Sequence, residues 1–198
     1  AYLNNMDDQL DSSGSLMSIV LTMEKPRQLS QLIDFFWRLD NLTAEHKEKI
    51  LILWRRLYLI FKKNEEQADY QKLLSNIVKW LGIMDEILDE MSEWLILSAK
   101  YVRVNHNSYR LIENLNKFVE KQPKIVGMTV IAMIEAGDLP LYKTEIIQSI
   151  VESLYKANQN KLADIICNSY FAIGQLFLHS IYEQYHYEKN TDEPDNKE

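Results

Sequence analysis

Two successive stretches of the chain decide its fold, because the second repeats the pattern of the first without a gap. Residues 72–99 read KLLSNIVKWLGIMDEILDEMSEWLILSA, and residues 110–137 read RLIENLNKFVEKQPKIVGMTVIAMIEAG. A shift of 38 positions places apolar residues of the first on apolar residues of the second. The coinciding pairs are Leu73 and Leu111, Leu74 and Ile112, Ile77 and Leu115, Trp80 and Phe118, Leu81 and Val119, Ile87 and Ile125, Leu88 and Val126, Leu95 and Met133, and Ile96 and Ile134. A fixed period of about 20–50 residues is typical of repeat proteins, and this period accommodates two helices and two turns.

Helical periodicity continues on both sides of these stretches. Apolar residues recur at spacings of three and four, Pro26 and Pro123 suit helix starts, and Gly137 suits a helix end. The predicted helices span residues 16–23, 26–39, 43–63, 69–81, 85–104, 108–121, 123–136, 140–157 and 161–187. We therefore predict an all-α protein, arranged as a right-handed α–α superhelix of about four antiparallel helix pairs.

The composition agrees with long helices joined by short turns. Only five of the 198 residues are Gly and four are Pro, fewer than a sheet protein with many tight turns would need. We predict a poorly ordered segment over residues 1–15, a helical-repeat domain over residues 16–187 and a disordered acidic tail over residues 188–198. The chain begins with Ala1, which fits either removal of an initiator methionine or excision from a larger protein.

The net charge, the length of the apolar runs and the cysteine content argue against several classes of function. The net charge of −7 argues against a dedicated binder of nucleic acid or of an anionic membrane. No apolar run reaches the roughly 18 residues that a membrane span requires. The single cysteine, Cys167, excludes an internal disulfide and favours the reducing cytoplasm. Because it lies in an apolar run with Ile165 and Ile166, we interpret it as a core residue rather than a nucleophile.

Candidate metal and acid–base residues have simpler interpretations. His179, Glu183 and His186 lie at i, i+4 and i+7 on one face of the last predicted helix, a spacing that would suit a divalent cation. The sequence offers no fourth ligand, so we interpret them as a polar stripe and predict neither a metal site nor a cofactor. The five carboxylates of residues 85–93 are interpreted as the solvent-facing side of an amphipathic helix.

The helix over residues 43–63 is both apolar and basic. Its apolar residues cover more than half of the circumference, which predicts a helix that is buried on two sides. Arg55 and Arg56, together with Lys47, Lys62 and Lys63, accompany aromatic residues on this helix. The main interpretation is a core helix bordered by charge, and the alternative is a nucleic-acid contact.

The last predicted helix ends in a group of tyrosines. Tyr182, Tyr185 and Tyr187 precede the polar tail. Tyrosine is favoured in interfaces, because its ring packs against a partner while its hydroxyl remains hydrated. We therefore predict contact with another domain or a homodimer through this helix.

The segment Lys121-Gln122-Pro123-Lys124-Ile125-Val126 joins two helices, and with residues 109–137 it resembles a HEAT-like α-solenoid unit. Residues 143–177 are more similar to a tetratricopeptide-type pair, with the small residues Ala163 and Ala172 at helix crossings. Overall the chain is similar to the helical C-terminal regions of large multidomain bacterial NTPases and anti-phage defence proteins. That resemblance implies a scaffold or sensor, with the chemistry in another domain.

No phosphate-binding loop, dinucleotide glycine pattern, His-Glu-x-x-His or Gly-x-Ser-x-Gly motif is present. We therefore expect a non-catalytic scaffold that mediates protein–protein contacts, as a C-terminal module of a larger protein. The first alternative is a nucleic-acid-contacting module that uses the helix over residues 43–63. The second is a metal-dependent enzyme with its site on the last helix.

Overall fold

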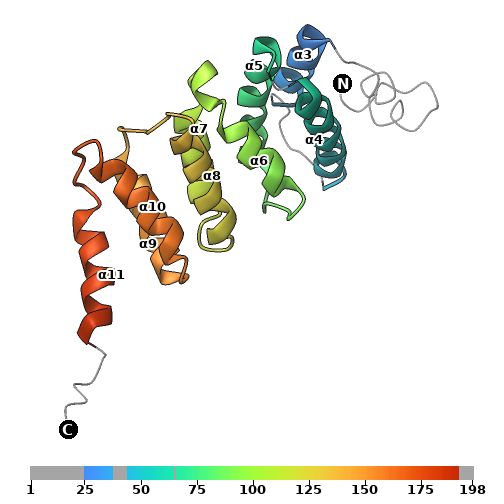
Figure 1. The fold of residues 1–198 in the computed structure, drawn as a ribbon. Helices are drawn as coiled ribbons and strands as arrows, with labels where there is room; N and C mark the ends of the chain where they lie inside the picture. Colours follow the sequence, from blue (N-terminus) through green and yellow to red (C-terminus); the bar gives the residue numbers. More distant parts are fainter. Residues whose placement is uncertain (1–24, 38–43, 65, 192–198) are drawn as a thin grey trace.

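A computed structural model describes residues 25–37, 44–64 and 66–191, and every regular element within them is helical (Figure 1). The prediction of an all-α chain is therefore confirmed for this part of the protein. The elements, with η denoting a 3-10 helix, are α3 (Pro26–Trp37), α4 (Ala44–Asn64), α5 (Ala68–Ile77), η1 (Val78–Ile83), α6 (Met91–Ala99), η2 (Val102–Asn105), α7 (Ser108–Asn116), α8 (Pro123–Glu135), α9 (Thr144–Lys156), α10 (Asn160–Phe171) and α11 (His179–Thr191).

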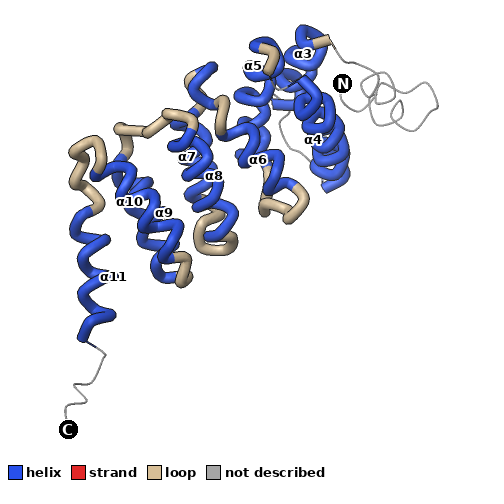
Figure 2. Tube along the Cα trace, viewed as in Figure 1, coloured by secondary structure: helices blue, strands red, loops and turns tan. Residues whose placement is uncertain are grey.

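The helices form two rows. In the first row α4, α6, α8 and α10 follow one another across the molecule, each in contact with the next (Figure 1). In the second row α3 contacts α5, α7 contacts α9, and α9 contacts α11, while η1 and η2 link α5 with α7. Contacts of α5 with α4 and α6, and of α9 with α8 and α10, join the rows, and loops connect the helices at both edges (Figure 2).

Burial follows the 38-residue alignment. Trp80 and Phe118 coincide in that alignment, and both are at most 4% exposed. In the first row Met91, Thr129 and Cys167 also lie 38 positions apart on α6, α8 and α10, and none is exposed. Because each large apolar side chain contributes about 1.5–3 kcal/mol when fully buried, this shared register accounts for much of the stability of both rows.

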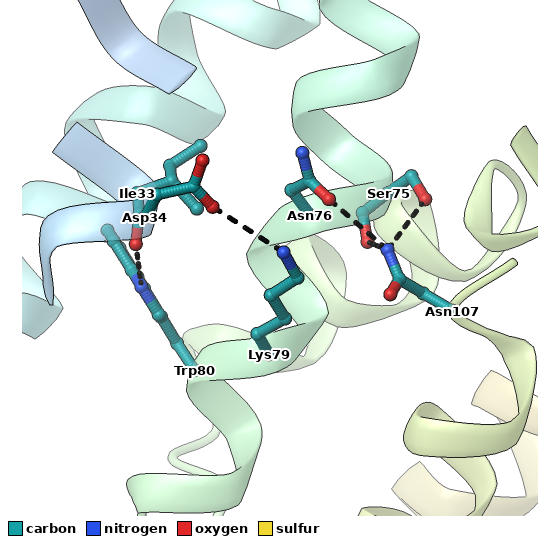
Figure 3. Close-up of polar contacts among 7 residues, drawn as sticks. All are labelled: Ile33, Asp34, Ser75, Asn76, Lys79, Trp80 and Asn107. Carbon is teal, nitrogen blue, oxygen red and sulfur yellow. Dashed lines mark hydrogen bonds and ion pairs between the residues drawn. The ribbon is translucent and has the colours of Figure 1, made fainter. Parts of the chain in front are cut away.

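Aromatic side chains pack α4 against η1 and α6. The Trp54 ring meets the Trp80 ring edge-on with centroids 5.8 Å apart, and it lies 6.0 Å from the Trp94 ring. Tyr58 lies one turn further along α4, with its ring 5.9 Å from that of Trp94. Trp80 Nε1 donates a hydrogen bond to the carbonyl oxygen of Ile33 at 3.4 Å, which also ties η1 to α3 (Figure 3). Aromatic pairs at these separations add to the burial energy, so this end of the molecule is a rigid core.

Polar contacts join α5 and η1 to neighbours on both sides (Figure 3). Lys79 Nζ lies 3.5 Å from Asp34 Oδ1 on α3. On the other side, Asn107 Nδ2 donates to the carbonyl oxygen of Ser75 at 2.9 Å and lies 3.3 Å from Asn76 Oδ1. Asn107 is buried, so these partners satisfy an amide that would otherwise destabilise the fold.

The second predicted helix of the first stretch begins later than the sequence analysis expects. Residues 85–90 form a loop, and α6 starts at Met91. The side chain of Gln122 holds this loop, because its Oε1 accepts a hydrogen bond from the Ile87 N–H at 2.7 Å and its Nε2 donates to the Ile87 carbonyl oxygen. Both backbone groups of Ile87 are therefore unavailable to a helix.

The predicted helix over residues 161–187 is wrong as a single element, because α10 ends at Phe171 and α11 begins at His179. Gly174 between them adopts a φ of 76°, a left-handed conformation that interrupts a helix. α11 continues to Thr191, into the segment assigned to the tail. The predicted helix over residues 16–23 and the predicted segment 1–15 lie outside the described residues.

Candidate functional site

The predicted tyrosine surface lies on α11, which contacts α9 and α10 at the C-terminal end of the molecule (Figure 1). Tyr185 stacks on Tyr155 of α9 with ring centroids 4.6 Å apart, and Tyr182 meets Phe171 of α10 edge-on at 5.6 Å. Tyr187 is 67% exposed. Tyr182 and Tyr185 therefore attach α11 to the rest of the protein, whereas Tyr187 is accessible to a partner.

A chain of polar contacts joins α11, α10 and α9. His186 Nε2 lies 2.9 Å from Asp164 Oδ1, and the Tyr155 hydroxyl donates to the same oxygen at 2.6 Å and lies 4.0 Å from Cys167 Sγ. Burial, reinforced by the hydrogen bond to Asp164, raises the pKa of Tyr155 above its ordinary range. Burial likewise raises the pKa of Cys167 to about 11. Both groups therefore keep their protons at neutral pH, and Cys167 is a thiol rather than a thiolate. The chain of contacts serves to link three helices.

The three metal candidates do not converge. His179 Nδ1 lies 3.2 Å from Glu183 Oε2, but His186 reaches across to Asp164 of α10 instead. Within the described residues, no three His, Cys, Asp or Glu side chains are grouped so that they would hold a metal ion.

The basic helix α4 has one exposed side besides those that face α5 and α6. Ile52 is 51% exposed and Leu59 is 46% exposed, although Trp54 on the opposite side is fully buried. Arg55 is exposed between these two apolar residues, and Arg56 is half-buried. The two arginines therefore border an outward surface of mixed apolar and basic character.

The same mixed surface recurs on α8 and α10, whereas α6 adds only the exposed charged residues Glu93 and Lys100. Each of these helices contacts the second row behind it and its neighbours beside it, which leaves one outward side. We call the outward side of α4, α6, α8 and α10 the first-row face. Its exposed residues are Ile52, Arg55, Leu59, Lys62, Lys63, Glu93, Lys100 at the end of α6, Lys124, Met128, Glu135, Lys161, Ile165 and Asn168.

Helix α8 shows why the local sequence produces this face. Lys124, Met128 and Glu135 are exposed at spacings of four and seven. Apart from Met128, all residues from Val126 to Ile134 are buried. On an α-helix these spacings place all three exposed side chains on one narrow stripe. The helix is thus enclosed on three sides, and Met128, 40% exposed, lies on the fourth side.

The sequence analysis did not find Met128 or Ile165 as surface residues, because an apolar side chain on α8 or α10 looks the same whether a neighbour covers it or not. One signal was available. Lys124 and Lys161 precede them by one turn, and the i+4 position on a helix shares the face of its charged predecessor. That comparison favours a solvent-facing position for both, although it fails on α5, where Leu73 is buried one turn after the exposed Asp69.

An open surface hollow of about 610 Å³ adjoins the end of this face. The end of α4 and the start of α5 line it with Lys63, Asn64, Gln67 and Gln71, and Tyr101 closes it from the α6 side. Lysines at the end of α4 are favourable because they oppose the negative end of the helix dipole. The hollow offers polar hydrogen-bonding groups rather than an apolar cavity.

Acidic residues gather at the opposite edge, in the loop that leads into α6. Asp85, Glu86, Asp89 and Glu90 are all exposed, but in a loop rather than on the helical face that the sequence analysis assigned to them. Lys47 of α4 forms an ion pair with Asp85. The loop is therefore negative, while the first-row face is predominantly positive.

Comparison with known proteins finds no relative: no family model, no curated protein and no solved structure matches the chain. None of the helices in the described residues is both long enough and apolar enough to cross a membrane. The functional argument therefore rests on the geometry and charge of the surfaces described above.

Proposed function

We propose that the protein is a non-catalytic scaffold that mediates protein–protein contacts through the first-row face. In this proposal the two rows are a HEAT-like, right-handed superhelical stack of antiparallel helix pairs. The contacts between consecutive first-row helices and the shared 38-residue register of buried residues support such a stack. Stacked helix pairs present long surfaces that suit extended partners.

One observation carries the proposal: Ile52, Leu59, Met128 and Ile165 are each 40–51% exposed on the same face. Single exposed apolar residues are ordinary, but a series of them along one face is a feature of interaction surfaces. By contrast, two of the three tyrosines proposed for self-association already pack within the protein. The first-row face is therefore a better supported contact surface than α11.

Site-specific photo-crosslinking in cells tests the proposal. A photoreactive amino acid replaces Met128 or Ile165 on the first-row face, and the matched controls carry it at Lys117 or Glu145, which are exposed beside α7 and on α9. We expect discrete higher-mass products from the first two positions and none from the controls. Equal or absent products at all four positions would contradict the scaffold function.

We also propose that the chain is a cytoplasmic module of a larger protein. The resemblance to helical C-terminal regions supports the second part, and a single buried cysteine without a disulfide partner supports the first. An immunoblot of the source cell would show a band well above 23.4 kDa if the chain is a module. A band at that mass would contradict it.

A second candidate function, contact with nucleic acid, is favoured by Arg55 and Lys63, which are both exposed on α4. A mobility-shift titration with RNA and DNA at low salt, with the Arg55→Glu/Lys63→Glu variant as comparison, tests it. Binding that weakens steeply with salt and disappears in the variant would support this function. No shift at low salt would remove it.

A further inference from the structure

The first-row face has a charge opposite to that of the whole chain. Among its exposed described residues six are basic and two are acidic, so these residues carry a net charge of +4, whereas the chain carries −7. The basic residues are Arg55, Lys62, Lys63, Lys100, Lys124 and Lys161. A local field of this sign attracts anionic partners even on an acidic protein.

Most of these cations are not neutralised within the protein. Arg55, Lys63, Lys100, Lys124 and Lys161 form no ion pair in the part of the chain that the structure describes. Several basic residues on the other elements have carboxylate partners, namely Lys79 with Asp34, Lys143 with Glu113, and Lys156 with Glu152, but Arg27, Arg103, Lys117 and Lys121 form no ion pair within the described residues either. The first-row face thus carries five cations that are unpaired within the described residues.

Apolar and basic groups alternate along this face at a helical spacing. Lys124 precedes Met128 by one turn of α8, and Lys161 precedes Ile165 by one turn of α10. Both helices begin at the lower edge of Figure 1, so the two lysines lie toward one edge and the two apolar side chains lie further up the face. A complementary ligand therefore needs anionic groups about 6 Å from aliphatic groups, repeated along its length.

We propose that the first-row face binds an acidic peptide segment of a partner protein. Aspartate or glutamate side chains of the segment pair with Lys124, Lys161 and Arg55, and its aliphatic side chains pack on Met128 and Ile165. This inference rests on the proposed scaffold function and names the chemistry of its partner.

The face suits a peptide better than a nucleic acid. Its exposed apolar groups are aliphatic, and the most exposed aromatic side chains of the described residues, Tyr142 and Tyr187, lie outside it. Single-stranded nucleic acids are bound mainly by stacking of bases on aromatic rings beside basic groups. An acidic peptide with leucine or isoleucine residues uses both kinds of group that the face offers.

Selection from a random peptide library tests the inference. The full chain is immobilised and challenged with peptides of about 12 residues, a length that would span several helices. We expect enrichment of peptides that combine Asp or Glu with Leu, Ile or Val. The enriched peptides are then labelled and titrated by fluorescence anisotropy against three proteins: the original chain, Lys124→Glu/Lys161→Glu, and the charge-matched control Lys72→Glu/Lys156→Glu on the second row.

The measured affinities decide whether the first-row face binds an acidic peptide. Reversing two charges of the face should weaken binding by about tenfold or more, and the control should change it by less than about threefold. Equal binding by all three proteins, enrichment without acidic residues, or no enrichment would overturn the inference. Tighter, steeply salt-dependent binding of an oligothymidine of about 20 nucleotides would also overturn it, in favour of nucleic acid.

The proposed function can fail separately. Photo-crosslinks from Met128 and Ile165 in cells report any protein partner, whatever its charge. If crosslinks form while no acidic peptide is selected, the scaffold function stands and only the acidic partner is wrong. If neither is observed, both proposals fail.

Discussion

The two stretches that share the 38-residue pattern bury both members of six of their nine coinciding apolar pairs, but they form different second helices. In residues 110–137 the second helix begins at Pro123, whereas in residues 72–99 the coinciding residue is Asp85 and the helix begins six residues later, at Met91. A proline at the first helical position has the required φ and lacks an N–H that would need a partner. The comparison shows that apolar periodicity determines which side chains are buried, while local chemistry determines where a helix begins.

The largest expected effect is a difference in unfolding free energy between substitutions of the two coinciding aromatic residues, Trp80 and Phe118. Trp80 is fully buried, meets Trp54 edge-on and donates a hydrogen bond to the Ile33 carbonyl oxygen, whereas Phe118 is buried without a close aromatic ring among the described residues. We expect Trp80→Ala to lower the free energy of unfolding by about 4–5 kcal/mol and Phe118→Ala by about 3 kcal/mol. Urea unfolding followed by circular dichroism measures both, and an equal or larger loss for Phe118→Ala would show that the stretches are equivalent in energy as well as in pattern.

A smaller effect tests what delays the start of α6. Gln122→Ala removes both hydrogen bonds to the backbone of Ile87, and we expect it to cost about 1–3 kcal/mol in unfolding free energy. Hydrogen exchange at the Ile87 amide should accelerate with it. Gln122→Glu keeps the acceptor but loses the donor, so its effect should lie between those of Gln122→Ala and the exposed control Lys121→Ala. Unchanged exchange at Ile87 would mean that Gln122 does not hold the loop.

These differences mark the limit of prediction from the sequence. The helices and their buried faces follow from the spacing of apolar residues, as the pairs Trp80 with Phe118 and Leu95 with Met133 show. The position of α6 does not follow, because it depends on Gln122, a residue 35 positions away from Ile87. The break at Gly174 was missed because apolar residues continue on both sides of it.

The candidate site shows the same limit. The sequence indicated Arg55 and Arg56, but it did not place Met128 and Ile165 beside the same surface. Whether an apolar residue on α8 or α10 is covered depends on the neighbouring helices, which a periodic pattern does not specify. Tyr182 and Tyr185, which the sequence analysis interpreted as an interface, pack against α10 and α9, a contact that the pattern did not specify.

Extending the comparison to α10 gives a pH-dependent prediction. Met91, Thr129 and Cys167 occupy the same buried position in successive first-row helices, and of the three only Cys167 ionises. Its pKa is raised from 9.0 to about 11, so the folded state keeps a proton that the unfolded chain loses. The stabilisation is therefore complete below about pH 9 and is lost as the pH rises toward 11.

We expect the unfolding free energy to fall by about 1 kcal/mol more in the original chain than in Cys167→Ala between about pH 8 and pH 10. Urea unfolding at the two pH values measures the difference. Tyrosines of the unfolded chain are about half ionised at pH 10, but Tyr155 and Tyr170 are present in both proteins, so their contribution cancels in the difference. Parallel pH dependences in the two proteins would contradict a raised pKa of the thiol.

The smallest expected effect concerns α11, which has no counterpart in the two aligned stretches. No described helix follows it, and its polar link is the half-exposed pair of His186 and Asp164. Partly exposed pairs contribute little, so His186→Ala should cost about 0.5 kcal/mol and accelerate hydrogen exchange in α11 while exchange in α8 is unchanged. Tyr187→Ala, at an exposed residue that makes no ring contact with the described part of the chain, is the matched control and should change neither. If His186→Ala accelerated exchange throughout α8 as well, α11 would unfold together with the rows, and the stack would be one cooperative unit that extends to the last helix.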